Sequence, residues 1–208
     1  MSYRVLCETI FILLLTLTAQ FLWKNLSILL ALVPTVYFFL ECHFRRRTWA
    51  DVGFKIRTIP QDIANNWALI LLVSVIIQLS VFLAARAWIP AYLDHVMARF
   101  PLAIGQTAQY LPGLFVGTLW EEINFRALYQ ERLSWFISPP VAIGFVSVVF
   151  GIGHWARGDP IIVLMDVLLV IIDGILYGII FARSKNLFVA WIAHFLADIF
   201  GLLFILLL

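Results

Sequence analysis

The sequence predicts an all-α integral membrane protein, a polytopic bundle of about seven transmembrane helices. Hydrophobic residues make up 63% of the 208-residue chain. Only 12% of the residues are charged, whereas soluble domains have about 25%. The mean hydropathy is +1.01. The apolar residues fall in runs of about 20, the length that a helix needs to cross the hydrocarbon core of a bilayer. This excess of apolar residues is too large for the core of a soluble protein of this size.

The predicted spans are seven apolar stretches, at residues 5–23, 26–43, 66–86, 106–128, 139–155, 161–182 and 187–207. A short polar connection at 23–25 joins the first two, which predicts a helical hairpin. We expect 5–23 to be a retained span rather than a cleaved signal peptide, because a second apolar stretch follows at once. Residues 1–208 are therefore interpreted as a single integral membrane domain.

The longest polar stretch, about residues 44–65, is predicted to be a loop in the cytosol or at the membrane interface. It contains three consecutive arginines at 45–47 and an amphipathic segment at 49–54. With the N-terminus in the cytosol, ten of the 14 Lys and Arg residues fall on the cytosolic side, and the four outside are Lys24, Arg86, Arg99 and Arg157. The positive-inside rule therefore favours a cytosolic N-terminus.

The charge pattern argues against a nucleic-acid partner. The formal net charge is only +2, and no run of Lys and Arg is interleaved with aromatic residues. The expected partners are the lipid bilayer and a molecule that lies at the membrane.

Two adjacent acids, Glu121 and Glu122, lie within the apolar span 106–128. Ionisable groups at bilayer depth are costly and usually line a functional site. Glu122 and Arg126 are four residues apart, share a helix face and can pair, whereas Glu121 lies about 100° around the helix. This spacing predicts that Arg126 neutralises Glu122 and leaves Glu121 for proton transfer. The alternative is a structural ion pair that fixes the register of the helix.

Two downstream spans carry histidines in equally apolar surroundings. His154 follows two glycines, which allow close approach of another helix, and His194 lies four residues before Asp198 on the same helix face. A carboxylate beside a histidine fixes its tautomer or raises its basicity. Each pair alone also fits a structural role between helices, but together with Glu121 they predict one shared polar site.

Other polar residues are predicted to be secondary. Asp166 and Asp173 are seven residues apart on one helix face, and we expect them to support the site by lining its cavity or by bonding to backbone groups and Tyr177. His43 and His95 are expected at the membrane surface, without a role.

The clustered groups suit peptide hydrolysis, which needs an activated water and donors for the developing oxyanion. Glu121, His154 and His194 are also the residue types that bind zinc. The sequence lacks the His-Glu-x-x-His spacing, so a mechanism without a metal or other cofactor is preferred over the zinc alternative.

Three motifs in this order, on separate apolar helices, resemble those of the CPBP intramembrane proteases, the family of the CAAX prenyl endopeptidases and the bacterial Abi proteins. They are Glu121-Glu122-x-x-x-Arg126, Phe150-x-x-x-His154 and His194-x-x-x-Asp198. The segment 183–187 also resembles the turn that precedes the last motif. The resemblance covers about residues 105–201 and implies a protease core of CAAX-prenyl-protease-like helices there.

The resemblance implies a glutamate-dependent endopeptidase. Glu121 would be the general base on water, helped by His154, while His194 and Asp198 would stabilise the oxyanion. Glu122 and Arg126 would support the site. The prenyl proteases typically carry Asn at the position of Asp198. An ionised Asp cannot donate a hydrogen bond, so Asp198 is either protonated or orients His194.

The resemblance leads us to expect a peptide or protein substrate at a bacterial inner membrane. Bacteriocin processing or immunity and the cleavage of a C-terminal sorting signal are the expected contexts. Two other classes stay open, namely a transporter coupled to protons or cations and a non-catalytic membrane scaffold. A transporter predicts acids along a path and paired repeats, whereas the acids here are clustered and no repeat is evident.

Overall fold

Helices are the only regular secondary structure over the residues that the computed structural model describes, 3–22, 27–99 and 107–207. The predicted all-α fold class is confirmed. The longer helices and the two π-helices between them are α1 (Tyr3–Leu22), α2 (Ser27–Phe44), α3 (Ile59–Leu71), η3 (Leu72–Ile77), α4 (Gln78–Trp88), α5 (Pro90–Arg99), α6 (Thr107–Glu122), η4 (Ile123–Gln130), α8 (Pro139–Gly153), α9 (Pro160–Ser184) and α10 (Leu187–Leu207). Short helices lie at η1 (Ala50–Val52), η2 (Ile56–Thr58) and α7 (Glu131–Leu133).

Helices occupy the positions of the predicted spans. Among the described residues, three helical segments have the length and apolar composition to cross a membrane: Ile56–Trp88, Pro160–Ser184 and Leu187–Leu206. Two shorter apolar helices are Leu32–Phe44 and Pro139–Gly153. The predicted hairpin connection at 23–25 and the start of the predicted span 106–128 lie outside the described residues.

The third predicted span begins earlier than expected, since the last part of the predicted loop 44–65 is helical from Ile59 onward. Pro60 stands in the first turn, where its missing N–H costs nothing. Asp62 places a carboxylate near the positive end of the helix dipole and accepts a hydrogen bond from Thr58 Oγ1 at 2.7 Å. These local signals extend the helix into a polar segment that hydropathy alone assigns to a loop.

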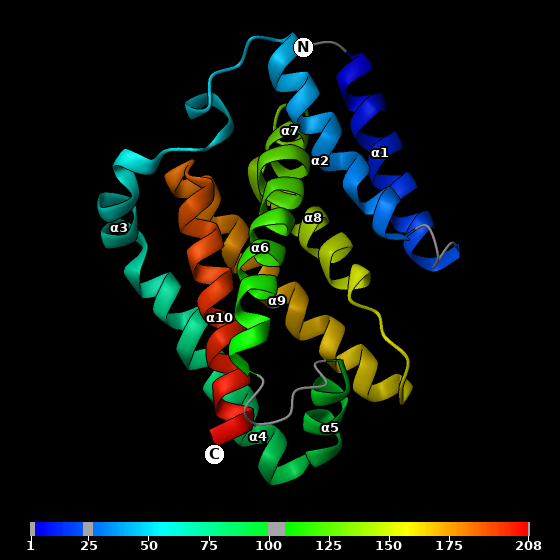
Figure 1. Ribbon diagram of the computed structural model, residues 1–208, viewed down its shortest axis with the longest axis vertical. Helices are drawn as coiled ribbons and strands as arrows, with labels where there is room; N and C mark the ends of the chain where they lie inside the picture. The colour runs from blue at the N-terminus through cyan, green and yellow to red at the C-terminus, as the bar shows by residue number, and fades with distance from the viewer. Residues whose placement is uncertain (1–2, 23–26, 100–106, 208) are drawn as a thin grey trace.

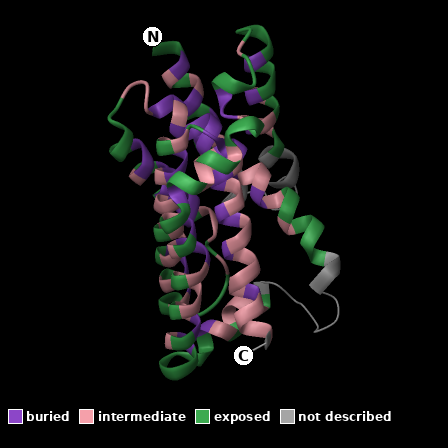
Figure 2. Cartoon of the chain, turned by 90° about the vertical axis from the view of Figure 1, so that its left-hand side faces the viewer, coloured by how far each residue is buried: buried purple, intermediate pink, exposed green. Residues whose placement is uncertain are grey.

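Helix α10 is central in the bundle. It packs against α6, α9, α4 and η3, with the paired helices α1 and α2 on one flank and α3–α4 on the other (Figure 1). The short helix α5 closes the end of the bundle near the C-terminus (Figure 1). Buried residues gather in the half of the bundle near the N-terminus, whereas the other half is mostly intermediate or exposed (Figure 2).

A buried charge network attaches helices α1 and α2 to the rest of the bundle. The Arg132 side chain on α7 is 1% exposed and pairs through Nη2 with Glu41 Oε2. Its Nη1 donates to Tyr37 Oη at 3.1 Å and to Thr9 Oγ1 at 3.3 Å. Since Thr9 lies on α1 and both Tyr37 and Glu41 lie on α2, one guanidinium holds both helices beside the segment that follows the two site glutamates.

The close contact between α8 and α9 depends on Gly151. A Cβ at this position would overlap the Ile171 side chain and lie 2.9 Å from the Val167 carbonyl oxygen. We expect Gly151→Ala to lower the free energy of unfolding by about 1–3 kcal/mol, because the α9 backbone cannot move aside freely. Unfolding of the purified protein in detergent measures the change.

The matched control is Gly144→Ala on the same helix, where a Cβ meets nothing within 4 Å. This variant should be as stable as the parent, or more stable by up to about 1 kcal/mol, because alanine favours the helix. Equal effects of the two substitutions would contradict the packing argument.

Candidate active site

The six site residues predicted from the sequence come together from three segments of the bundle. Glu121 and Glu122 end α6 where it continues into the π-helix η4, which carries Arg126. His154 caps the C-terminus of α8, and His194 and Asp198 lie in α10. π-Helical turns are rare and often occur at functional sites. Here the turn directly follows the two acids.

Glu122 is the buried anchor of the site. Its side chain is fully buried, with Oε2 3.1 Å from Arg126 Nε, so the ion pair expected from the sequence is present. Its other oxygen, Oε1, lies 2.9 Å from His194 Nδ1. A carboxylate beside a guanidinium is an acceptor, so Nδ1 of His194 carries the proton and Nε2 faces the cavity. The sequence did not indicate this contact, which joins residues 72 positions apart.

Glu121 differs from Glu122 in its access to the cavity. The Glu121 side chain is 26% exposed, whereas that of Glu122 is 0% exposed. Glu121 Oε2 lies 3.6 Å from His194 Nε2, and Oε1 lies 4.0 Å from His154 Nε2. Glu121 is therefore open to water while it lies between two imidazoles.

His154 is oriented by its own helix. Its Nδ1 lies 2.8 Å from the Phe150 carbonyl oxygen. A carbonyl oxygen can only accept, so Nδ1 carries a proton and Nε2 is directed at Glu121. This contact gives a physical reason for the spacing of four residues between Phe150 and His154.

Aromatic rings enclose the charged groups. His194 stacks on Tyr177 with ring centroids 4.5 Å apart and an interplanar angle of 18°, and the edge-on Phe150 ring is 5.7 Å away. The Arg126 guanidinium lies 5.5 Å from the Phe150 ring centroid and 5.9 Å from that of Tyr177. Its Nη1 and Nη2 have no hydrogen-bond partner among the described residues, so the ring faces solvate the cation. The sequence assigned Tyr177 no such contact, since no local pattern marks it.

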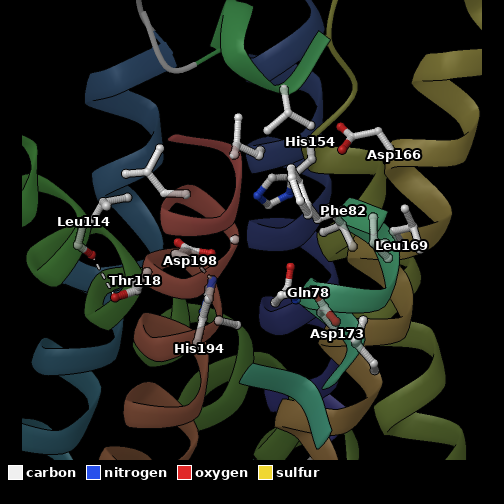
Figure 3. A pocket seen from close by; sticks show the side chains of 18 of the residues that line it. Gln78, Phe82, Leu114, Thr118, His154, Asp166, Leu169, Asp173, His194 and Asp198 are labelled. Atoms are coloured by element: carbon white, nitrogen blue, oxygen red, sulfur yellow. Dashed lines mark hydrogen bonds and ion pairs between the residues drawn. The ribbon is translucent and has the colours of Figure 1, made fainter. Parts of the chain in front are cut away.

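Asp198 completes the group, with Oδ2 3.9 Å from His194 Nε2 and a side chain that is 33% exposed. Glu121, His154, His194 and Asp198 all line one cavity of about 490 Å³ between the helices. Figure 3 shows His194 and Asp198 on one side of this cavity and Gln78 and Asp173 on the other. The cavity is large enough to admit a segment of peptide beside the acids.

The two secondary aspartates line the same cavity. Asp173 Oδ2 accepts a hydrogen bond from Gln78 Nε2 at 3.0 Å. Asp166 accepts one from Tyr92 Oη at 3.3 Å, and its Oδ2 lies 3.6 Å from His95 Nε2.

The two histidines expected at the surface differ in their environments. His43 is exposed, as expected. His95 is more enclosed by protein than His43, because its side chain is only 7% exposed. Helix α5 packs against α9, and this tertiary contact buries a polar residue that the sequence places beside an apolar span.

The zinc alternative stays a prediction. The described residues contain no group of three or more His, Cys, Asp or Glu side chains arranged to hold a metal ion.

Residues 103–200 match the family model described as type II CAAX prenyl endopeptidase Rce1-like. This span contains every residue of the site described above except Gln78, Tyr92 and His95, and it nearly coincides with the segment 105–201 that carries the three motifs. The match confirms the resemblance to the CAAX prenyl endopeptidases. No curated protein and no solved structure matches the chain.

Proposed function

We propose, because residues 103–200 match the family model described as type II CAAX prenyl endopeptidase Rce1-like, that the protein hydrolyses a peptide bond of a membrane-associated protein or peptide, with Glu121 as the general base. The observation that carries this proposal is the contrast between the two acids. Glu122 is fully buried between Arg126 and His194, whereas Glu121 is open to the cavity and lies between two histidines.

In the proposed reaction, a water molecule lies between Glu121 and His154. Glu121 takes a proton from the water as its oxygen attacks the scissile carbonyl carbon. Glu121 then gives this proton to the leaving nitrogen, the C–N bond breaks, and a carboxyl and an amine product form. No metal or other cofactor takes part in this scheme.

The proposed oxyanion donor is His194. In its imidazolium form Nδ1 donates to Glu122 and Nε2 donates into the cavity, where the oxyanion develops. The contact with Glu122 and the stacking on Tyr177 fix the ring before substrate binds, so little reorganisation is needed during the reaction. We propose that Asp198 orients this ring from the side of the cavity.

The test is turnover by the purified full chain in detergent. The probes are a farnesylated peptide that ends in a Cys-aliphatic-aliphatic-x sequence and an unprenylated apolar peptide, with the cleaved bond identified by mass spectrometry. We expect cleavage of at least one probe, unaffected by a chelator. Loss of cleavage with chelator would contradict the metal-free scheme, and no cleavage of either probe would contradict the proposed activity towards them.

Substitution of Asp198 tests its role. We expect Asp198→Asn to keep cleavage within about tenfold of the parent, because the amide can still bond to His194 or itself donate to the oxyanion. Asp198→Ala removes both possibilities and should lower kcat by about 10²-fold. The two rates are compared on the same probe. Equal losses in both variants would show that the carboxylate charge itself is required.

For the biological context we propose the CPBP branch of these proteases in a bacterial inner membrane, with the N-terminus in the cytosol. Bacteriocin processing or immunity, or cleavage of a C-terminal sorting signal, is the proposed task. The predicted cytosolic elements lie at one end of the bundle, where the Asn186 side chain donates to the Lys55 carbonyl oxygen at 2.9 Å. This contact supports placing the 44–58 segment and the α9–α10 turn on the same side of the membrane.

A further inference from the structure

The cavity contains a carboxylate that the proposed reaction does not use. Asp173 lies on α9 one turn before Tyr177 and lines the cavity together with the proposed catalytic residues. Its Oδ2 is bonded to Gln78, but its Oδ1 is buried and has no hydrogen-bond partner among the described residues. A buried carboxylate oxygen without a partner is costly, so a donor that enters the cavity and bonds to the Asp173 carboxylate would offset this cost.

The carboxylate is held in place by a preformed contact. Gln78 Nε2 donates both to Asp173 and, at 3.2 Å, to the carbonyl oxygen of Val73 in the π-helix η3. Gln78 Oε1 lies 3.3 Å from where a Cβ on Gly201 would be, so the glycine on α10 leaves room for the amide. Three elements therefore fix Asp173 with Oδ2 bonded to Gln78 and with Oδ1 lacking a partner among the described residues.

The charges around the cavity indicate which donor fits. The described lining residues include four carboxylates and two histidines, but neither Lys nor Arg; the carboxylates belong to Glu121, Asp166, Asp173 and Asp198. An anionic side chain, such as that of Glu, would be repelled from these carboxylates. A cation would satisfy Oδ1 through a charge-assisted hydrogen bond.

The remaining lining suits the stem of a long basic side chain. Ile77, Val81 and Leu169 line the cavity together with Asp173. Lys and Arg bury their aliphatic stems along such apolar surface while the charged head reaches a polar partner. A small ammonium ion would leave this surface in contact with water.

We propose that Asp173, positioned by Gln78, is a substrate-binding subsite for a Lys or Arg side chain, and that the peptide substrate therefore carries a basic residue near the scissile bond. The inference rests on the proposed function only in taking the bound group to be part of a peptide substrate. It places the specificity of the site on the wall of the cavity formed by α4 and α9, across from the proposed catalytic group.

The test uses three capped tripeptides that differ only in the middle residue: acetyl-Phe-Lys-Phe-amide, acetyl-Phe-norleucine-Phe-amide and acetyl-Phe-Glu-Phe-amide. Isothermal titration calorimetry on the full chain in detergent at pH 7 gives the dissociation constants. We expect the lysine peptide to bind about tenfold more tightly than the norleucine peptide and the glutamate peptide to bind most weakly. In Asp173→Asn, which can still accept from Gln78, the preference for lysine should vanish.

Asp166→Asn is the matched control, because it removes a different carboxylate from the same cavity and should retain a clear preference for the lysine peptide. Absence of the preference in the parent, its survival in Asp173→Asn, or equal loss in both variants would overturn the subsite. Because peptide binding is measured without turnover, either proposal can be contradicted without the other. A lysine preference without cleavage contradicts only the proposed function, and cleavage without the preference contradicts only the subsite.

Discussion

Glu121→Gln is expected to lower kcat/KM for peptide cleavage by about 10²–10⁴-fold, because the amide cannot take a proton from the attacking water. The substitution keeps the shape of the side chain, and Glu121 is partly exposed, so folding should be little affected. Initial rates on the cleaved probe measure the effect, and thermal unfolding in detergent checks the fold.

The matched control is Glu131→Gln. Glu131 lies on α7, ten residues further along the chain, and pairs with Lys185 at 2.8 Å outside the cavity. It should retain the parental rate. A Glu121→Gln variant as active as this control would rule out Glu121 as the base. Asp198, the other acid next to His194 that lines the cavity, would then be the candidate base.

Arg126→Met is expected to lower the free energy of unfolding by about 3–5 kcal/mol, because it leaves the buried Glu122 carboxylate without its cation. The methionine fills much of the same volume between Phe150 and Tyr177, so loss of charge rather than loss of packing dominates. Activity should fall as well, since Glu122 also holds His194. Unfolding in detergent, followed by circular dichroism, gives the stability change.

The double variant Glu122→Gln with Arg126→Met separates charge from packing. It removes both members of the buried pair, and we expect it to be more stable than Arg126→Met alone, because no unpaired charge remains. Arg183→Met, at an exposed position near the end of α9, serves as the surface control and should change stability by less than about 0.5 kcal/mol. An Arg126→Met protein as stable as this control would contradict the view that Arg126 neutralises Glu122.

Much of the candidate site was predictable from sequence because its members repeat at helical spacing. Glu122 and Arg126, and likewise His194 and Asp198, are four residues apart, and a helix brings such residues onto one face whatever its surroundings. The ion pair of the first two and the approach of the second two follow from that local geometry. The extra helical turns before residue 66 were not predicted, because they depend on residues that favour a helix N-terminus. The burial of His95 was not predicted, because it depends on packing against another helix.

The sequence by itself determined that the protein is a helical membrane protein and that the acids and histidines of the candidate site lie in the second half of the chain. These conclusions rest on apolar composition and short-range spacing, which are properties of each segment alone. Only the tertiary structure decided that Glu122 holds His194, that Tyr177 stacks on it, and that Gln78 fixes Asp173. Each of these contacts joins different helices, and which side chains meet there depends on the rotation and depth at which the helices pack. Packing also distinguished the two adjacent glutamates, because it buried Glu122 completely and left Glu121 open to the cavity.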